Sequence, residues 1–147
     1  MASIADKAAE MFAQSFNCCQ SVLATCGAGR GVPRDLAIRL GEGPGGGFGR
    51  MGNICGAVSG AIMSIGLKHN RGPDAKDAAG RAEAQRCVRE FLRRFQEAHG
   101  SLVCRDLVGF DISTDAGYQA ARDSGAMKEL CPKFIRTAVE IVEDLLG

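Results

Sequence analysis

Apolar residues recur at intervals of three and four along most of the chain, and this helical spacing constrains the fold more than any other feature. No segment shows the alternation of apolar and polar residues that is typical of a strand. The sequence therefore predicts an all-α fold, a single compact bundle of about six to seven helical segments with a glycine-rich loop. The longest expected helix covers residues 74–98, with an apolar stripe formed by Ala84, Cys87, Val88, Phe91, Leu92 and Phe95.

Capping residues and prolines set the expected helix boundaries. Asn17 and Gln20 form an Asn-x-x-Gln capping pattern, and Asn53 is expected to cap the most apolar helix. Ser101 is expected to open a short helical turn. Pro132 is expected at the first position of the last helix, where a missing N–H costs least. The expected helices cover residues 2–16, 18–28, 34–40, 54–67, 74–98, 102–108, 114–124 and 132–146.

Length, composition and charge fit one domain that spans residues 1–147. A chain of 147 residues can bury roughly 68–70% of the surface that it exposes when unfolded. With no Trp and one Tyr, its core must be mostly aliphatic. The 18 Lys and Arg against 17 Asp and Glu give a net charge of +1. Because nucleic-acid-binding domains carry a clear basic excess, we expect no nucleic-acid partner.

Two features favour a cytoplasmic protein without membrane insertion. The longest apolar run, residues 54–67, is shorter than the roughly 18 residues that a membrane-spanning helix needs. Asp6 and Glu10 interrupt the N-terminal segment, which lacks the apolar core of a secretion signal. Static disulfides are rare in the reducing cytoplasm, so the seven cysteines indicate metal binding, redox chemistry or burial.

Residues 41–60 contain nine of the 20 glycines and read GEGPGGGFGRMGNICGAVSG. They include two GxGxxG matches, but a dinucleotide fingerprint must lie between a buried strand and a helix, and no strand is expected here. A P-loop is excluded because Asn53, not Lys, follows Gly52. Two interpretations stay open. The segment is either a tight turn or an anion site formed by the backbone N–H groups of Gly47, Gly49, Gly52 and Asn53.

Four of the seven cysteines fall at expected helix N-termini, where the helix dipole favours the thiolate over the thiol. They are Cys18, Cys55, Cys104 and Cys131. Several thiolates in one site would concentrate negative charge, which converging helix N-termini would stabilise. Of these four, Cys55 is the candidate nucleophile. The remaining cysteines lie on apolar helix faces and are expected to be buried as small hydrophobic residues: Cys19, Cys26 and Cys87.

No C-x-x-C pair occurs, so any site that the four candidate cysteines build must come from the tertiary fold. Such a site suits either exchangeable disulfides or an iron–sulfur cluster that uses all four thiolates as ligands. Gly56 and Gly60 add a GxxxG pattern to the apolar helix. Small residues four apart let a neighbouring backbone approach closely, so we expect a second helix start to lie near Cys55.

These segments resemble a known family. The CGAxxG motif that begins at Cys55, with flanking segments FNCCQSVL, SLVCRDLVG and ELCPKFIRTAVEIVEDL, is similar to the C-GCAxxG-C-C family of redox-active proteins. The likeness runs from about Phe16 to Leu145. The resemblance implies redox activity, with an iron–sulfur centre as one form, because a similar domain is associated with cytochrome-type electron carriers. The family's four cysteines correspond to Cys18, Cys55, Cys104 and Cys131, and Cys19 stands where the family commonly has alanine.

The leading hypothesis is a small redox protein whose four cysteines carry out thiol–disulfide or electron-transfer chemistry, with or without an iron–sulfur cluster. Whether it acts as an enzyme or as an electron carrier stays open, and the sequence identifies no redox partner. A homodimer through the apolar first and last helices is also open. One alternative is a non-enzymatic helical module that binds an anion at the glycine loop or zinc at the cysteines. Another is a helical interaction protein with buried cysteines.

Overall fold

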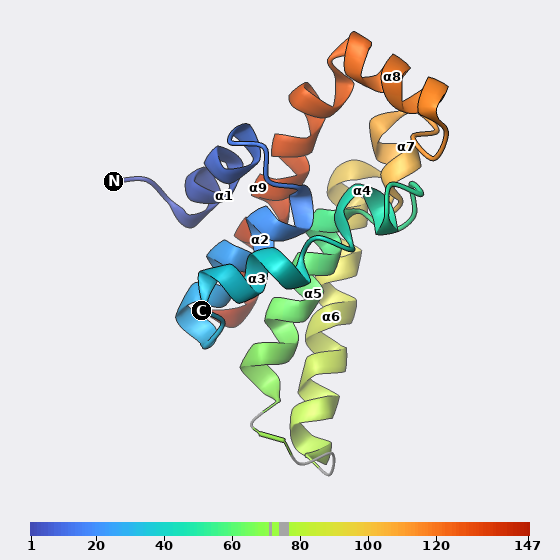
Figure 1. Ribbon diagram of the computed structural model, residues 1–147. Coiled ribbons are helices and arrows are strands. Elements are labelled where there is room, and N and C mark those ends of the chain that lie inside the picture. The colour runs from blue at the N-terminus through green and yellow to red at the C-terminus, as the bar shows by residue number, and fades with distance from the viewer. Residues whose placement is uncertain (71, 74–76) are drawn as a thin grey trace.

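The computed structural model describes residues 1–70, 72–73 and 77–147, which form an all-α fold (Figure 1). Seven helices have seven or more residues, which confirms the predicted bundle. These ranges contain no strand, and an isolated β-bridge joins Ile54 to Val103. In chain order the elements are α1 Ile4–Ala13, α2 Cys18–Gly27, the 3-10 turn η1 Ala28–Arg30, α3 Arg34–Leu40, α4 Gly45–Phe48, α5 Gly56–His69, α6 Ala78–His99, α7 Cys104–Val108, α8 Asp115–Ser124 and α9 Ala126–Leu146.

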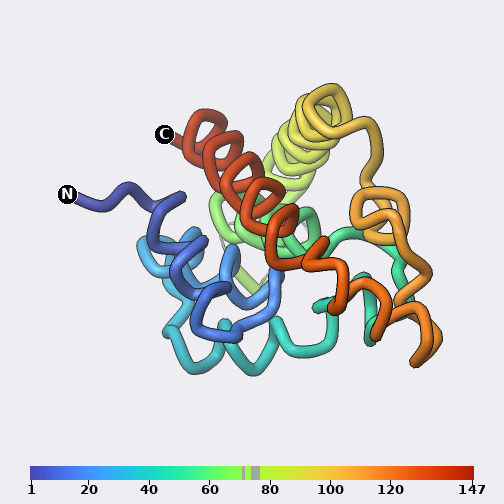
Figure 2. Tube along the Cα trace, turned by 90° about the horizontal axis from the view of Figure 1, so that it is seen from above, coloured from blue at the N-terminus to red at the C-terminus, as the bar shows by residue number. Residues whose placement is uncertain are grey.

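Helix α2 lies at the centre of the fold and is buried along most of its length. It packs against α1, α3, α5 and α9, while α5 and α6 lie side by side as a long hairpin (Figure 1). The first and last helices, α1 and α9, pack against each other, and both chain ends lie on the same side of the molecule (Figure 2). In the described part of the chain, no helix is long and apolar enough to cross a membrane. The main core includes Val22, Val58, Ile65, Phe91, Phe95, Ile135, Val139 and Val142.

The capping box predicted for the second helix is present. The Asn17 side chain accepts a hydrogen bond from the Gln20 N–H at 2.8 Å, and the Gln20 side chain accepts one from the Asn17 N–H at 2.8 Å. These two reciprocal bonds satisfy N–H groups that the helix itself leaves unpaired. Helix α2 therefore begins at Cys18, as the sequence predicts.

The GxxxG pattern of α5 forms its contact with α2. A Cβ atom at Gly56 would lie 3.0 Å from the backbone N of Cys19 and 3.1 Å from the Cβ of Cys18. A Cβ atom at Gly60 would lie 3.0 Å from the carbonyl O of Cys19. Glycine at both positions therefore lets the two backbones touch. This contact confirms the expectation that a second helix start, that of α2, lies next to Cys55.

The prediction that Asn53 caps the apolar helix is wrong. The N-cap of α5 is Cys55, two residues later. Asn53 precedes the bridging residue Ile54, and its carbonyl O accepts the N–H of Cys104 at 2.6 Å. Asn53 therefore lies in an extended segment that pairs with residues next to Val103, and helix α5 begins only after this segment.

Ser101 does not cap the next short helix. Helix α7 begins at Cys104 with Val103 as its N-cap, and the Ser101 hydroxyl instead accepts the N–H of Val103 at 3.0 Å. Cys104 is therefore the first residue of its helix rather than the third. The longest helix, α6, begins at Ala78, and its expected start at Asp74 lies outside the described residues.

Pro132 does not open the last helix, because α9 begins at Ala126 and runs through the proline. Gly125, with φ 76°, ends α8 and serves as the N-cap of α9. Glycine adopts this left-handed conformation without steric cost, so a second helix can start one residue later. Cys131 therefore lies in the second turn of α9. The prediction that it is an N-cap is wrong.

The glycine-rich loop, residues 41–53, is tied to the starts of two helices. At its beginning, the Asn17 side-chain amide donates to the carbonyl O of Gly41 at 3.0 Å. At its end, the N–H of Arg105 donates to the carbonyl O of Gly52 at 3.1 Å. The loop thereby fixes the N-terminus of α2 relative to that of α7.

Candidate functional site

All four candidate cysteines line one cavity of about 390 Å³. Cys18 begins α2, Cys55 precedes α5, Cys104 begins α7 and Cys131 lies in α9. The fold thus brings together four thiols that are far apart in the sequence. Most of the remaining wall is apolar and includes Phe12, Phe16, Leu107, Val108, Ile112, Met127 and Phe134.

The antiparallel bridge between Ile54 and Val103 orients Cys55 and Cys104. The N–H of Cys55 donates to the carbonyl O of Leu102 at 2.9 Å, which extends the pairing by one residue. Successive side chains of an extended segment point to opposite faces. Cys55 and Cys104 therefore share the face opposite to Ile54 and Val103, and this face borders the cavity.

Cys18 and Cys131 are in direct contact within the cavity. The thiol of Cys18 donates a hydrogen bond to the sulfur of Cys131, which lowers the pKa of Cys131 although burial opposes this shift. The same bond, together with burial, raises the pKa of Cys18 well above its usual value. Cys131 is therefore the thiol of this pair that ionises first. Cys18 is half-buried and Cys131 is 6% exposed.

Cys55 and Cys104 are protonated at neutral pH. Burial raises the pKa of Cys55 to about 11, even though the N–H groups of Ala57 and Val58 at the start of α5 lower it in part. Burial, followed by the proximity of Cys55 and Cys131, raises the pKa of Cys104 to about 12. At Cys55, burial therefore outweighs the effect of the helix start.

Of the three cysteines outside the candidate site, Cys19 and Cys26 are core residues as predicted, whereas the predicted burial of Cys87 is only partial. Cys19 and Cys26 are fully buried, and burial raises the pKa of each to about 12. Cys87 is half-buried and packs against the main core. Thiols that stay protonated are poor nucleophiles, so a structural role fits all three.

The residues predicted as an anion site, Gly47, Gly49, Gly52 and Asn53, lie in the glycine-rich loop. The N–H groups of Gly49, Gly52 and Asn53 donate to the carbonyl O atoms of Gly43, Gly46 and Gly47 at 2.9, 3.1 and 2.9 Å. Gly47 is buried with φ 71°, and a Cβ atom there would meet the backbone of Asn53. These bonds hold the loop together. Its cavity-lining residues are Gly45, Gly46 and Arg50.

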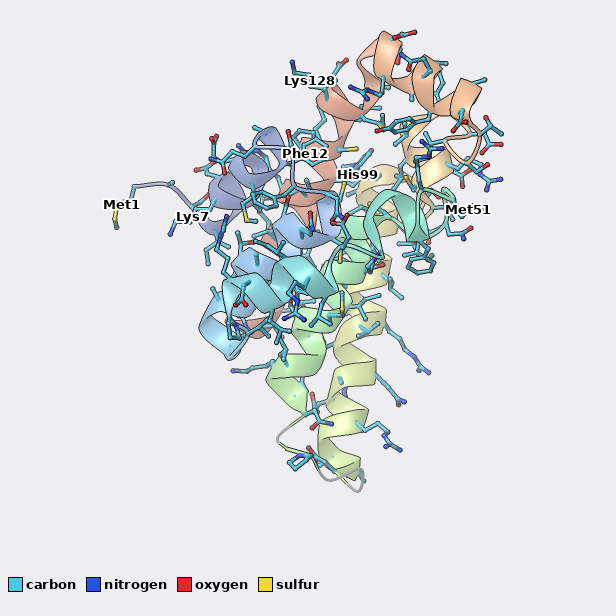
Figure 3. All side chains as sticks on the ribbon, viewed as in Figure 1. Met1, Lys7, Phe12, Met51, His99 and Lys128 are labelled. Carbon is cyan, nitrogen blue, oxygen red and sulfur yellow. The ribbon has the colours of Figure 1, made fainter. Side chains whose placement is uncertain are left out.

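Most of the cavity wall was not predicted from the sequence, including Phe12, Arg50 and Tyr118. Phe12 lies between α1 and α9, whereas Met51, next to Arg50 in the chain, lies at the outer edge of the molecule (Figure 3). The guanidinium carbon of Arg50 lies 4.4 Å from the ring centroid of Tyr118. Phe12 belongs to the first helix, which the sequence predicts to be apolar. No sequence signal links Arg50 to Tyr118, because the glycine-rich loop meets α8 only in the folded chain.

The donor set of the cavity matches an iron–sulfur cluster in its chemistry. Four cysteine thiols are the ligands that such clusters use. However, among the residues that the structure describes, no group of three or more His, Cys, Asp or Glu side chains is placed to hold a metal ion.

The protein is a helical bundle with four cysteines around one cavity. The chain matches, over residues 16–145, the model of the family described as "Putative redox-active protein (C_GCAxxG_C_C)". It therefore belongs to that family, which confirms the resemblance seen in the sequence. Neither a search of curated proteins nor a search of solved structures found a match.

Proposed function

We propose that the protein carries out thiol–disulfide exchange with Cys18 and Cys131 as the reacting pair. The observation that carries this proposal is that the two thiols line the same cavity and shift each other's pKa in opposite directions. A thiolate is the attacking form of cysteine, and the contact with Cys18 favours it at Cys131. The family description, which names redox activity, supports the same class of chemistry.

The exchange takes place in two steps. The Cys131 thiolate attacks one sulfur of a substrate disulfide, a mixed disulfide forms, and the other substrate sulfur leaves as a thiolate. The Cys18 thiol then loses its proton to that leaving thiolate and attacks Cys131. A Cys18–Cys131 disulfide forms, and the second substrate sulfur leaves as a thiolate, which takes a proton from water. Two electrons pass to the substrate, which is reduced to two thiols while the protein is oxidised.

In this scheme the thiols of Cys55 and Cys104 react more slowly than that of Cys131. Both border the same cavity, yet burial holds their pKa values at about 11 and about 12. Few of these thiols are ionised near pH 7, so they attack slowly. We expect them to be alkylated and oxidised after Cys131.

The proposal is tested by adding 2-hydroxyethyl disulfide to the reduced protein without oxygen and following released thiol and protein mass. The wild-type protein should release two thiols for each Cys18–Cys131 pair oxidised. Cys131→Ser should slow the release by at least about tenfold, because the ionisable attacker is missing. Cys18→Ser should stop after one thiol, with the mixed disulfide trapped at Cys131.

Cys87→Ser is the matched control, because Cys87 is partly exposed but does not border the cavity. Its thiol release should equal that of the wild type. The proposal is wrong if Cys131→Ser reacts at the wild-type rate, or if the mixed disulfide in Cys18→Ser maps to another cysteine.

The iron–sulfur form is the second candidate, and the four thiol donors in one cavity favour it. Protein purified without oxygen is assayed for iron, acid-labile sulfide and zinc. Stoichiometric iron and sulfide would favour the cluster, and stoichiometric zinc with unreactive thiols would favour the binding module.

A further inference from the structure

Arg50 is the one charged side chain, among the residues described, that lines the cysteine cavity. The rest of the wall consists of aromatic, aliphatic, small polar and thiol-bearing residues. Small-molecule sites commonly combine an apolar wall with a few placed polar groups that orient the ligand. The position of Arg50 therefore gives this cavity one fixed positive charge.

The backbone at Arg50 is held in an unfavourable conformation. Its φ is 64°, a left-handed value that glycine adopts freely and that costs a bulkier residue free energy. Phe48 of the same loop has a similar φ of 65°, and four of its glycines also have positive φ: Gly46, Gly47, Gly49 and Gly52. A loop so rich in glycine has an arginine at this strained position, and the side chain contacts Tyr118 at the cavity.

The guanidinium of Arg50 is only partly used by the protein. One nitrogen, Nη2, lies 2.8 Å from the Asp115 carboxylate. The Asp115 side chain is 99% exposed, and ion pairs in water are weak and easily exchanged. A guanidinium has five N–H donors in a planar fork. Several donors therefore stay available to an anionic group that enters the cavity.

We infer that Arg50 binds a carboxylate of a small disulfide substrate that enters the cavity. This inference rests on the proposed thiol–disulfide exchange. A volume of about 390 Å³ falls in the range of small-molecule sites, roughly 300–1,000 Å³. Cys131 is 6% exposed, which suits a slender ligand better than a disulfide on a folded protein surface. The planar fork of arginine matches the two oxygens of a carboxylate.

Three symmetric disulfides of similar length test this inference. They are 3,3′-dithiodipropionate, which is anionic, 2-hydroxyethyl disulfide, which is neutral, and cystamine, which is cationic. The readout is the ratio of second-order rate constants for the anionic and the neutral disulfide. Arg50→Gln should lower this ratio by about tenfold, because it removes a charge-assisted hydrogen bond to the carboxylate. In the same variant, the rate constant for the cationic disulfide should rise relative to that for the neutral one.

A second variant should move the same ratio in the opposite direction. Asp115→Asn removes the carboxylate that competes for Arg50, so the anionic-to-neutral ratio should rise by about two- to fivefold. Arg86→Gln is the matched control, since Arg86 is exposed and paired with Glu83 at 2.7 Å but lies outside the cavity. It should leave the ratio unchanged. A merely structural role of Arg50 would slow all three substrates equally.

The outcomes separate this inference from the proposed function. If the wild-type protein reacts with each of the three disulfides no faster than Cys131→Ser does, the proposed thiol–disulfide exchange itself is wrong. If exchange occurs but neither Arg50→Gln nor Asp115→Asn changes the ratio, carboxylate binding by Arg50 is overturned. Circular dichroism of each variant checks folding. Should Arg50→Gln not fold, Asp115→Asn alone decides, because a constant ratio there contradicts the inference.

Discussion

At the scale of single residues, the chemistry depends most on Cys131. Its thiolate is favoured by a neighbouring thiol, that of Cys18, rather than by a helix N-terminus. A hydrogen bond to a buried charge is strong because little water competes with it, and it offsets part of the cost of burying that charge. In the proposed exchange, Cys131 therefore reacts first while its neighbour holds the proton for the second step.

Removing Cys18 should raise the pKa of Cys131. In Cys18→Ala the hydrogen bond that lowers this pKa is lost, and the burial that raises it remains. Less thiolate is then present at a given pH below the new pKa. The rate of alkylation of Cys131 by iodoacetamide, followed by peptide mass spectrometry, should show its midpoint at a higher pH than in the wild-type protein.

Cys26→Ala, which removes a fully buried cysteine outside the cavity, serves as the control. It should leave the midpoint at Cys131 where it is in the wild type. A midpoint that is the same in Cys18→Ala and the wild type would contradict the assigned hydrogen bond.

The sequence predicts the set of four cysteines but not their individual roles. The set follows from two local signals, helix starts and the family motif at Cys55. Roles depend on burial and on the neighbour that each thiol meets. Cys55 does lie at a helix start, yet burial raises its pKa to about 11, and this could not be read from the residues around it.

At the scale of helices, the contact between α2 and α5 should be sensitive to one added methyl group. In Gly60→Ala the new Cβ atom would lie 3.0 Å from both the carbonyl O of Cys19 and the Cβ of Val22. Overpacking of this kind costs roughly 1–3 kcal/mol. Urea denaturation should show a lower free energy of unfolding by about that amount.

Gly66→Ala is the matched control on the same helix. Apart from its own stretch of helix, no described atom lies within 4 Å of the position that its Cβ atom would take. Because alanine favours helix over glycine by roughly 0.5–1 kcal/mol, this variant should be more stable than the wild type. Equal effects of the two substitutions would contradict the close approach of α2 and α5 at Gly60.

Helix types and many boundaries could be predicted because caps act locally. The Asn17 cap and its Gln20 partner are read directly from the sequence and are present in the fold. The start of α9 could not be predicted in this way. The preference of Pro132 for a first helical position yields to Gly125, whose left-handed conformation sets the start earlier.

At the scale of the whole molecule, the first and last helices are joined by an ion pair. Arg136 Nη1 of α9 lies 2.6 Å from an Asp6 carboxylate oxygen of α1. Hydrogen bonds from Arg136 and then from Ser3 lower the pKa of Asp6 to about 2 from a usual value of 3.8. A lowered folded-state pKa stabilises the fold above the unfolded pKa, and this contribution is lost as the pH falls from about 4 to about 2.

The Asp6→Asn variant tests this pH dependence. At pH 7 it should unfold at lower urea concentration than the wild type, and the difference should shrink towards zero near pH 2. Glu10→Gln, elsewhere on α1, is the control and should not reproduce this pattern. A difference that stays constant from pH 7 to pH 2 would contradict the role of the Asp6 carboxylate.

Elements from most of the chain border the cavity. They are α1, α2, α5, α7, α8, α9 and the glycine-rich loop. A shared site could be predicted from cysteine count and the GxxxG contact. Its shape could not, because the bridge of Ile54 to Val103 and the meeting of Arg50 with Tyr118 join segments distant in the sequence.

The most direct test of the redox site is to identify the first disulfide that forms. Reduced protein is treated with a limiting amount of 2-hydroxyethyl disulfide without oxygen, the remaining thiols are blocked, and the peptides are mapped by mass spectrometry. The account predicts that Cys18 and Cys131 are joined first. A first disulfide that joins any other two cysteines, or four thiols that stay reduced, would contradict it.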